Sequence, residues 1–147
     1  MKFEGSFQVN APPNVVWSVV TNPNKFGQAI PDLKSLVVKD KSSFTAEFKV
    51  KLGMVGGTLK MDFKFDELNE PNHVKIVGRG TGVQSTVDLK IDLNLSKTDS
   101  GSVVKWDADV TVGGLVASIG SRLIESVTKD KVTEIITKLK KVIEGTK

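Results

Sequence analysis

Apolar and polar residues alternate along most of the first two thirds of the chain. From Val83 to Leu95 every second residue is apolar except Ser85, and the residues between them are polar or charged. Strict alternation is typical of a β-strand with one buried face, so the pattern predicts antiparallel strands that are solvated on one side. The stretches with this pattern are 3–9, 44–52, 59–65, 74–76, 83–95 and 104–112, with a weaker one at 35–41.

Prolines mark two short helices between the first and second predicted strands. Ala11-Pro12-Pro13 opens a helix that should run to Val20, because proline is tolerated in a first helical turn. Asn22-Pro23 opens a second helix in the same way, with Asn22 as its cap. This helix should end near Ile30, since the proline that follows disfavours a helical conformation in the residue before it.

Apolar residues spaced mostly three and four apart predict a long amphipathic helix from Gly114 to about Ile143. The spacing slips between Val127 and Val132, where three charged residues intervene, so we expect a bend or a solvated patch there. The apolar side of this helix can cover the dry face of the sheet. The order of elements therefore predicts a single α+β domain over residues 1–147, in which a curved sheet grips the long helix.

Composition excludes many classes of function. The 147 residues include no cysteine and one histidine, His73, which excludes disulfides, cysteine nucleophiles and zinc ribbons. The net charge of +4 comes mostly from Ser121 onward, where seven bases face four acids, and it suits the end of a helix. Nucleic-acid binding would need a stronger basic face. The chain has neither an apolar run of membrane-spanning length nor a leader-like N-terminus, so a cytoplasmic location is expected.

The inward rows of the predicted sheet carry no group that can transfer a proton. Ser85 is a hydroxyl without a visible base, and His73 is expected near solvent at the start of a strand. General acid–base catalysis needs a titratable group within reach of the substrate, so we assign no catalytic residue and no metal ligand. Of the loop residues, Asp32 and Arg79 could still reach the mouth of a cavity.

Two groups of glycines stand out. The run Gly78-Arg79-Gly80-Thr81-Gly82 looks like part of a dinucleotide fingerprint, but a strand rather than a helix follows it. We therefore interpret the run as a tight turn or a bulge. Gly113-Gly114 and Gly120 surround the start of the long helix. They either let the helix lie close to the sheet or form a flexible gate together with residues 26–30 and 53–57.

A set of short motifs extends through the whole chain. Ala11–Trp17 opens the first helix, Ile30-Pro31 ends the second, and Val50–Gly57 forms a glycine-bearing turn. Gly78-Arg79-Gly80 ends a strand, and Val112–Ile124 opens the last helix. In this order the motifs resemble the START-like, or SRPBCC, helix-grip superfamily, and within it the CoxG family of carbon monoxide dehydrogenase subunits.

The resemblance implies a helix-grip fold, in which a curved seven-stranded antiparallel sheet wraps around a long C-terminal helix and two short helices join strands 1 and 2. It implies an elongated apolar cavity that takes an isoprenoid, quinone or lipid-like ligand, without a cofactor. Family members are linked to molybdenum-containing carbon monoxide dehydrogenase, so such a dehydrogenase is the expected partner, and peripheral membrane contact stays open. Asp32 stands where the family commonly has glycine. The expected ligand-binding residues are Ile30, Phe48, Met54, Met61, Phe63, Val87, Leu89, Ile91, Trp106, Ala108, Leu115, Ile119 and Leu123.

Two alternatives to a non-enzymatic ligand carrier stay open. An enzyme resembling the polyketide cyclases or hydrolases of the superfamily would use an inward polar group, with Ser85, Asp32 or Arg79 as candidates. A ligand-free assembly factor would have a filled core and would contact its partner through loop residues such as Met54. In that case Trp106 and the other apolar rows are ordinary core.

Overall fold

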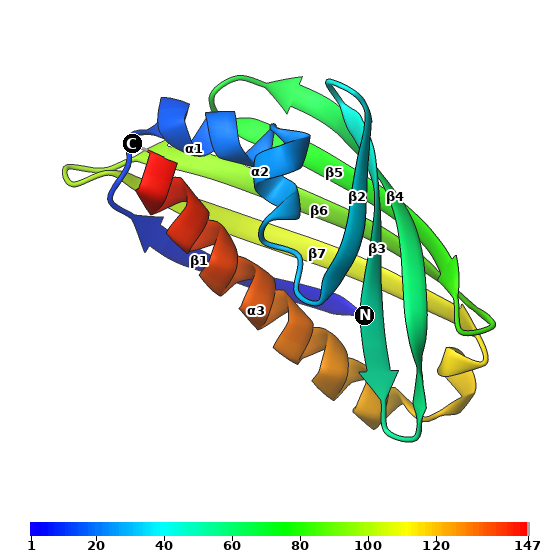
Figure 1. Cartoon of the computed structure of the whole chain (residues 1–147). Helices are drawn as coiled ribbons and strands as arrows, with labels where there is room; N and C mark the ends of the chain where they lie inside the picture. Colours follow the sequence, from blue (N-terminus) through cyan, green and yellow to red (C-terminus); the bar gives the residue numbers. More distant parts are fainter. Residues whose placement is uncertain (147) are drawn as a thin grey trace.

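The computed structural model describes residues 1–146 and contains an antiparallel sheet of seven strands that curves around a long helix (Figure 1). The order across the sheet is β1-β7-β6-β5-β4-β3-β2, so the first strand pairs with the last one. This arrangement confirms the predicted α+β helix-grip architecture. The strands are β1 (Lys2–Val9), β2 (Leu33–Asp40), β3 (Ser43–Leu52), β4 (Val55–Asn69), β5 (His73–Gly82), β6 (Ser85–Lys97) and β7 (Ser102–Gly114).

The two short helices between β1 and β2 are present as predicted. They are α1 (Pro13–Val20) and α2 (Pro23–Gly27), each with proline in its first turn. The Asn22 side chain accepts hydrogen bonds from two backbone amides of α2, at 3.0 and 3.2 Å, which is a regular N-cap. The helix ends at Gly27 rather than near Ile30, and the chain continues to Ile30 as hydrogen-bonded turns.

The last helix, α3 (Ser121–Thr146), begins later than the predicted Gly114. β7 extends to Gly114, and a short 3-10 turn, Val116–Ser118, separates the strand from the helix. Gly114 and Gly120 have φ angles of +84° and +122°, a backbone conformation that interrupts a right-handed helix. α3 continues through residues 127–132 without a break, and two of the three intervening charged residues are exposed, so of the two expected alternatives the structure shows the solvated patch.

β5 continues through the glycine run 78–82, so its interpretation as a turn or a bulge is wrong. The two buried glycines of the run pair in regular register with β6. Glycine is required on this inner face because a Cβ atom at Gly80 would collide with the Met61 side chain. The turn lies instead at Val83-Gln84, where φ is +54° and +55°, a rare conformation for a β-branched valine.

A filled core occupies the half of the molecule beneath α1, α2 and the C-terminal half of α3. Phe44 of β3 is completely buried, and its ring stacks on that of Phe63 with centroids 5.0 Å apart. The ring of Phe26 in α2 also lies near Phe44, with 6.0 Å between the two ring centroids. Leu139 and Ile143 of α3 close this end of the core and are also fully buried.

Candidate functional site

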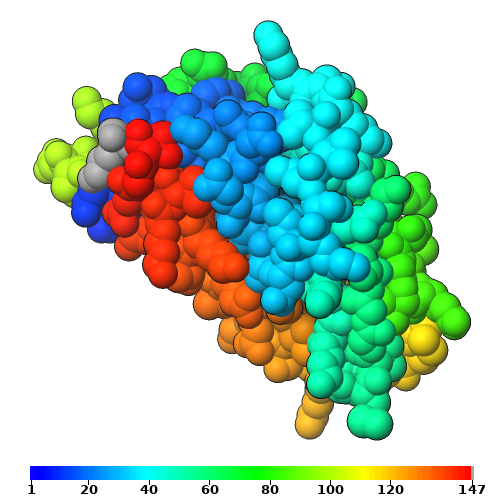
Figure 2. Space-filling view, in the orientation of Figure 1, coloured from blue at the N-terminus to red at the C-terminus, as the bar shows by residue number. Residues whose placement is uncertain are grey.

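An apolar cavity of about 170 Å³ lies between the inner face of the sheet and the N-terminal half of α3. Strands β3, β4, β6 and β7 form one wall, and α3 residues from Ile124 to Ile135 form the other. In the space-filling view this part of α3, in orange, lies beside the green-cyan β3–β4 hairpin (Figure 2). The cavity is therefore at the opposite end of the sheet from the phenylalanine core.

Short side chains explain why this end is hollow. The inward residues of β6 at this end, Val87 and Leu89, are only half-buried, although they lie on the same inward row as buried residues further along the strand. The α3 residues on the other side, Val127 and Val132, are also half-buried. Valines on both walls leave space that phenylalanine rings fill at the other end.

The two hydroxyl groups that line the cavity are already engaged with the backbone. Ser85 Oγ donates a hydrogen bond to the Val83 carbonyl at 3.0 Å and accepts one from the Val116 amide at 2.8 Å. Thr128 Oγ1 donates to the carbonyl one turn earlier in α3, at 2.7 Å. Among the described residues, no buried side-chain nitrogen or oxygen lacks a partner. Both hydroxyls therefore have structural roles, and neither is paired with a base.

Lys131 is the one charged residue among the described residues that line the cavity. Its side chain is 31% exposed, and Nζ lies 3.2 Å from Asp32 Oδ2 and 3.8 Å from Glu134 Oε1. Asp32 has φ of +56°, and its carbonyl accepts a hydrogen bond from the Lys49 amide at 3.1 Å. The ion pair thus connects the segment before β2 to α3 at the mouth of the cavity, with the lysine stem along the apolar wall.

A second, more polar hollow of about 500 Å³ adjoins this mouth. It shares Val50 and Lys131 with the apolar cavity, and Lys49, Lys51 and Asp32 provide its other charged groups. An apolar chamber that meets a mainly cationic hollow at a single lysine can hold a molecule with an apolar part and a polar end.

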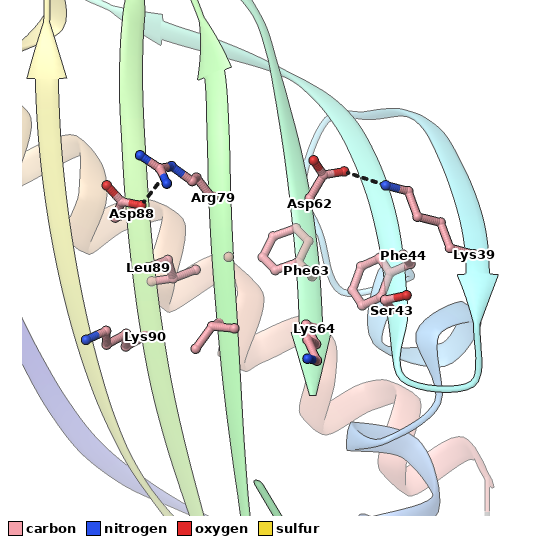
Figure 3. Close-up of a pocket in the computed structure, with 12 residues that line it drawn as sticks. Lys39, Ser43, Phe44, Asp62, Phe63, Lys64, Arg79, Asp88, Leu89 and Lys90 are labelled. Carbon is pink, nitrogen blue, oxygen red and sulfur yellow. Dashed lines mark hydrogen bonds and ion pairs between the residues drawn. The ribbon is translucent and has the colours of Figure 1, made fainter. Parts of the chain in front are cut away.

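A third hollow lies on the outer face of the sheet, where two of the lining cations pair with carboxylates and further lysines add positive charge (Figure 3). Lys39 Nζ is 3.3 Å from Asp62, and Arg79 Nε is 3.5 Å from Asp88. A hydrogen bond from the Thr45 hydroxyl, aided by Lys39, holds the pKa of Asp62 below its ordinary value. Arg79 therefore belongs to the outer surface and does not line the apolar cavity, although the sequence left open that it could reach the mouth.

Four of the predicted ligand-binding residues line the cavity, namely Phe48, Met61, Val87 and Leu89. They come from β3, β4 and β6, so the curved sheet brings together residues that are far apart in sequence. Their role in binding a ligand stays a prediction.

Other predicted residues lie in or against the core. Ile30, Phe63 and Ala108 are buried, and Ile91 packs against the core while partly exposed. The Trp106 ring covers Gly5 on the neighbouring strand β1, where it occupies the space that a side chain at that glycine would need. The strand positions among them lie on the expected inner face of the sheet, and all of these residues lie outside the cavity lining.

The remaining predicted residues surround the cavity end of the molecule. Met54 is fully exposed at the tip of the β3–β4 hairpin, and the neighbouring Gly53 lies against the exposed Leu123 near the start of α3. Leu115 is also exposed, and Ile119 is partly buried. The expected gate segments 53–57 and 113–120 therefore lie at this end. The third expected gate segment, residues 26–30, lies in the filled core instead, where Phe26 and Ile30 are buried.

Sequence reasoning missed several lining residues, although most of them carry a signal. The apolar ones belong to the predicted inward rows of the strands or to the apolar stripe of the long helix. Lys131 lies where that stripe slips. The lining residues that we did not single out as binding are Val50, Leu52, Leu59, Gly82, Val83, Ser85, Val110, Val112, Val116, Ile124, Val127, Thr128, Lys131, Val132 and Ile135.

The described residues offer neither a metal-binding cluster nor a membrane-spanning helix. No group of three or more His, Cys, Asp or Glu side chains is placed to hold a metal ion. His73 lies at the start of β5, as expected, and its Nε2 atom is 2.9 Å from Asp92 Oδ1. None of the described helices is both long and apolar enough to cross a membrane.

Similar solved structures share this fold at low sequence identity. A conserved protein from Geobacillus kaustophilus is 24% identical, with a TM-score of 0.86 and coverage of 97% of this chain and 95% of that chain. A START superfamily protein from Mycobacterium smegmatis is 12% identical, with a TM-score of 0.71 and 99% coverage of both chains. A protein from Thermus thermophilus is 10% identical, with a TM-score of 0.69 and 97% coverage of both.

At these identities the structural likeness shows the fold alone. Comparison with curated proteins gives no match. A sequence profile that describes the CoxG subunit of carbon monoxide dehydrogenase matches residues 5–144, which is nearly the whole chain. The seven-stranded sheet, the long helix and the matched span thus lead to one conclusion, that the chain belongs to the CoxG family and has a START-like fold.

Proposed function

We propose that this protein binds an apolar small molecule in the cavity between the sheet and α3, and that it does so without catalysing a reaction. The observation that carries this proposal is the lining, which is apolar except for two engaged hydroxyls and Lys131 at the mouth. Apolar contact gains roughly 25 cal/mol per Å² of surface removed from water, less the cost of ordering the ligand.

The size of the cavity limits what it can enclose. Its volume of about 170 Å³ is close to that of a cavity that holds benzene, roughly 150 Å³. An isoprenoid, quinone or lipid-like ligand would place one apolar segment inside and extend the rest through the mouth. Larger ligands would require α3 to move away from the β3–β4 hairpin.

The family name supports an accessory role beside a molybdenum-containing dehydrogenase of the carbon monoxide type. Exposed Met54, Leu115 and Leu123 lie at the cavity end and are the side chains that we propose contact such a partner or a membrane surface. A ligand released at this end would emerge next to whatever is bound there.

Native mass spectrometry of the protein purified from its own cells tests the proposal. We expect an added mass that organic extraction identifies as an apolar molecule. Val87→Trp fills the cavity and should abolish the added mass, whereas Val37→Trp, on an exposed position of β2, should retain it. A clean apo mass that quinones and lipids do not change, or a ligand that Val87→Trp retains, would contradict the proposal.

A further inference from the structure

The cavity offers a ligand one polar group that can change its partner. Ser85 and Thr128 already donate their hydroxyl hydrogens to backbone carbonyls, so neither offers a ligand a free donor. Lys131 differs, because its partners are exposed carboxylates at the surface. An ammonium group donates hydrogen bonds and accepts none. The polar end of a ligand that reaches Lys131 must therefore be an acceptor.

The charges around the mouth favour an acceptor that is negatively charged. Lys49, Lys51 and Lys131 border the adjoining hollow, where Asp32 is the one acid among the described lining residues. Glu134, on the next turn of α3, is further from the Lys131 ammonium than Asp32 is. The hollow therefore has an excess of positive charge directly outside the apolar chamber.

We propose that the ligand is a single-chain amphiphile with an anionic head, and that Lys131 binds this head while the apolar chain occupies the cavity. The inference rests on the proposed function and adds the chemical class of the ligand. A carboxylate or a phosphate head fits equally, because each provides several acceptor oxygens for a charge-assisted hydrogen bond.

Asp32 is the group that the anionic head displaces. Its side chain is 57% exposed, and an ion pair at that exposure contributes little stability, so separating it costs little. The Asp32 backbone is held independently, through the hydrogen bond from the Lys49 amide to its carbonyl. The carboxylate can therefore turn into solvent while the chain at the mouth stays in place.

Isothermal titration calorimetry with dodecanoate and dodecanol tests the inference, since the two probes share a chain and differ in the charge of the head. We expect dodecanoate to bind the full chain about tenfold more tightly, the difference that one charge-assisted hydrogen bond provides. Dodecyl phosphate distinguishes the two anionic heads from each other.

Three variants locate the effect. Lys131→Met keeps the apolar stem and should remove the preference for dodecanoate over dodecanol. Asp32→Asn removes the competing carboxylate and should tighten dodecanoate binding. Lys129→Met, an exposed position on the same helix, is the matched control and should behave as the unmodified protein does.

The outcomes separate this inference from the proposed function. Equal affinity for the acid and the alcohol would overturn the anionic class and leave apolar binding in place. A preference that survives Lys131→Met would overturn the role of that residue. Binding of neither probe would overturn the proposed function, and the inference with it. If Lys131→Met fails to fold, Asp32→Asn decides, because unchanged dodecanoate affinity would contradict the displacement.

Discussion

The two ends of the sheet have the same hydrophobic pattern and different packing. At one end, Phe44 and its aromatic neighbours meet α1, α2 and the C-terminal half of α3, and little space remains. At the other end, the same strands meet only the N-terminal half of α3 across a cavity. The alternating pattern therefore specifies which face is dry, whereas the number of covering helices and the size of the side chains specify whether it is filled.

The largest expected contrast comes from two phenylalanines on the same face of β3. Phe44→Ala should destabilise the protein by about 3–5 kcal/mol, because it removes a fully buried ring from a tightly packed cluster. Phe48→Ala, at a half-buried position beside the cavity, should cost roughly half of that or less. Urea denaturation followed by circular dichroism measures both values. Equal losses of stability would mean that the two ends are packed alike.

A smaller contrast is expected when valines are enlarged. Val20→Leu adds a methylene group at a position of α1 with no exposed surface, and overpacking there should cost about 1–3 kcal/mol. Val127→Leu adds the same group on the cavity side of α3 and should change stability by less than about 0.5 kcal/mol, because free volume accepts it. Thermal unfolding of both variants checks the difference, and a large loss for Val127→Leu would show that no such volume exists in solution.

The smallest expected effect is on the outer surface, which both ends share. The Thr45 hydroxyl and Lys39 lower the pKa of Asp62, so this carboxylate stabilises the fold above its ordinary pKa. That contribution disappears as the pH falls through the lowered pKa of the folded state. Thr45→Val should raise the pKa of Asp62, which an NMR titration measures. The stabilising contribution of this carboxylate should then be lost at a higher pH than in the unmodified protein.

Asp40 is the internal control in the same titration. Its pKa is lowered mainly by the Ser42 amide and then by the Ser43 and Ser42 hydroxyls, and Thr45 is not involved. The pKa of Asp40 should therefore be the same in the unmodified protein and in the Thr45→Val variant. An unchanged Asp62 in the Thr45→Val variant would contradict the assigned cause of its shift.

Local rules were sufficient for most of the architecture. The period-two rows predicted the strands, and the Asn22-Pro23 cap predicted the start of α2. Local sequence rules were insufficient at glycines. Glycine occurs in turns, and it also occurs inside strands where a neighbouring side chain fills the space that a Cβ atom would need. The run 78–82 is an unbroken strand that pairs with β6, and Gly80 leaves room for Met61 of the neighbouring strand β4.

The candidate site was predictable to a lesser extent. Phe48 and Leu89 line the cavity, and Phe63, on an equally regular inward row, lies in the core instead. Lys131 interrupts the apolar stripe of the helix, and its partner Asp32 is distant in the sequence and approaches only in the folded chain. A pattern along one segment contains no information about what another segment leaves uncovered.

The class of the fold, the dry face of each strand and the apolar side of the last helix all follow from the amino-acid sequence, because they depend on side-chain spacing within a segment. The position of the hollow and the charge that borders it follow only from the folded chain. Those features depend on the volumes that facing segments bring together and on where α3 crosses the sheet. Packing volume is a property of contacts between segments, so it appears only once the chain is folded.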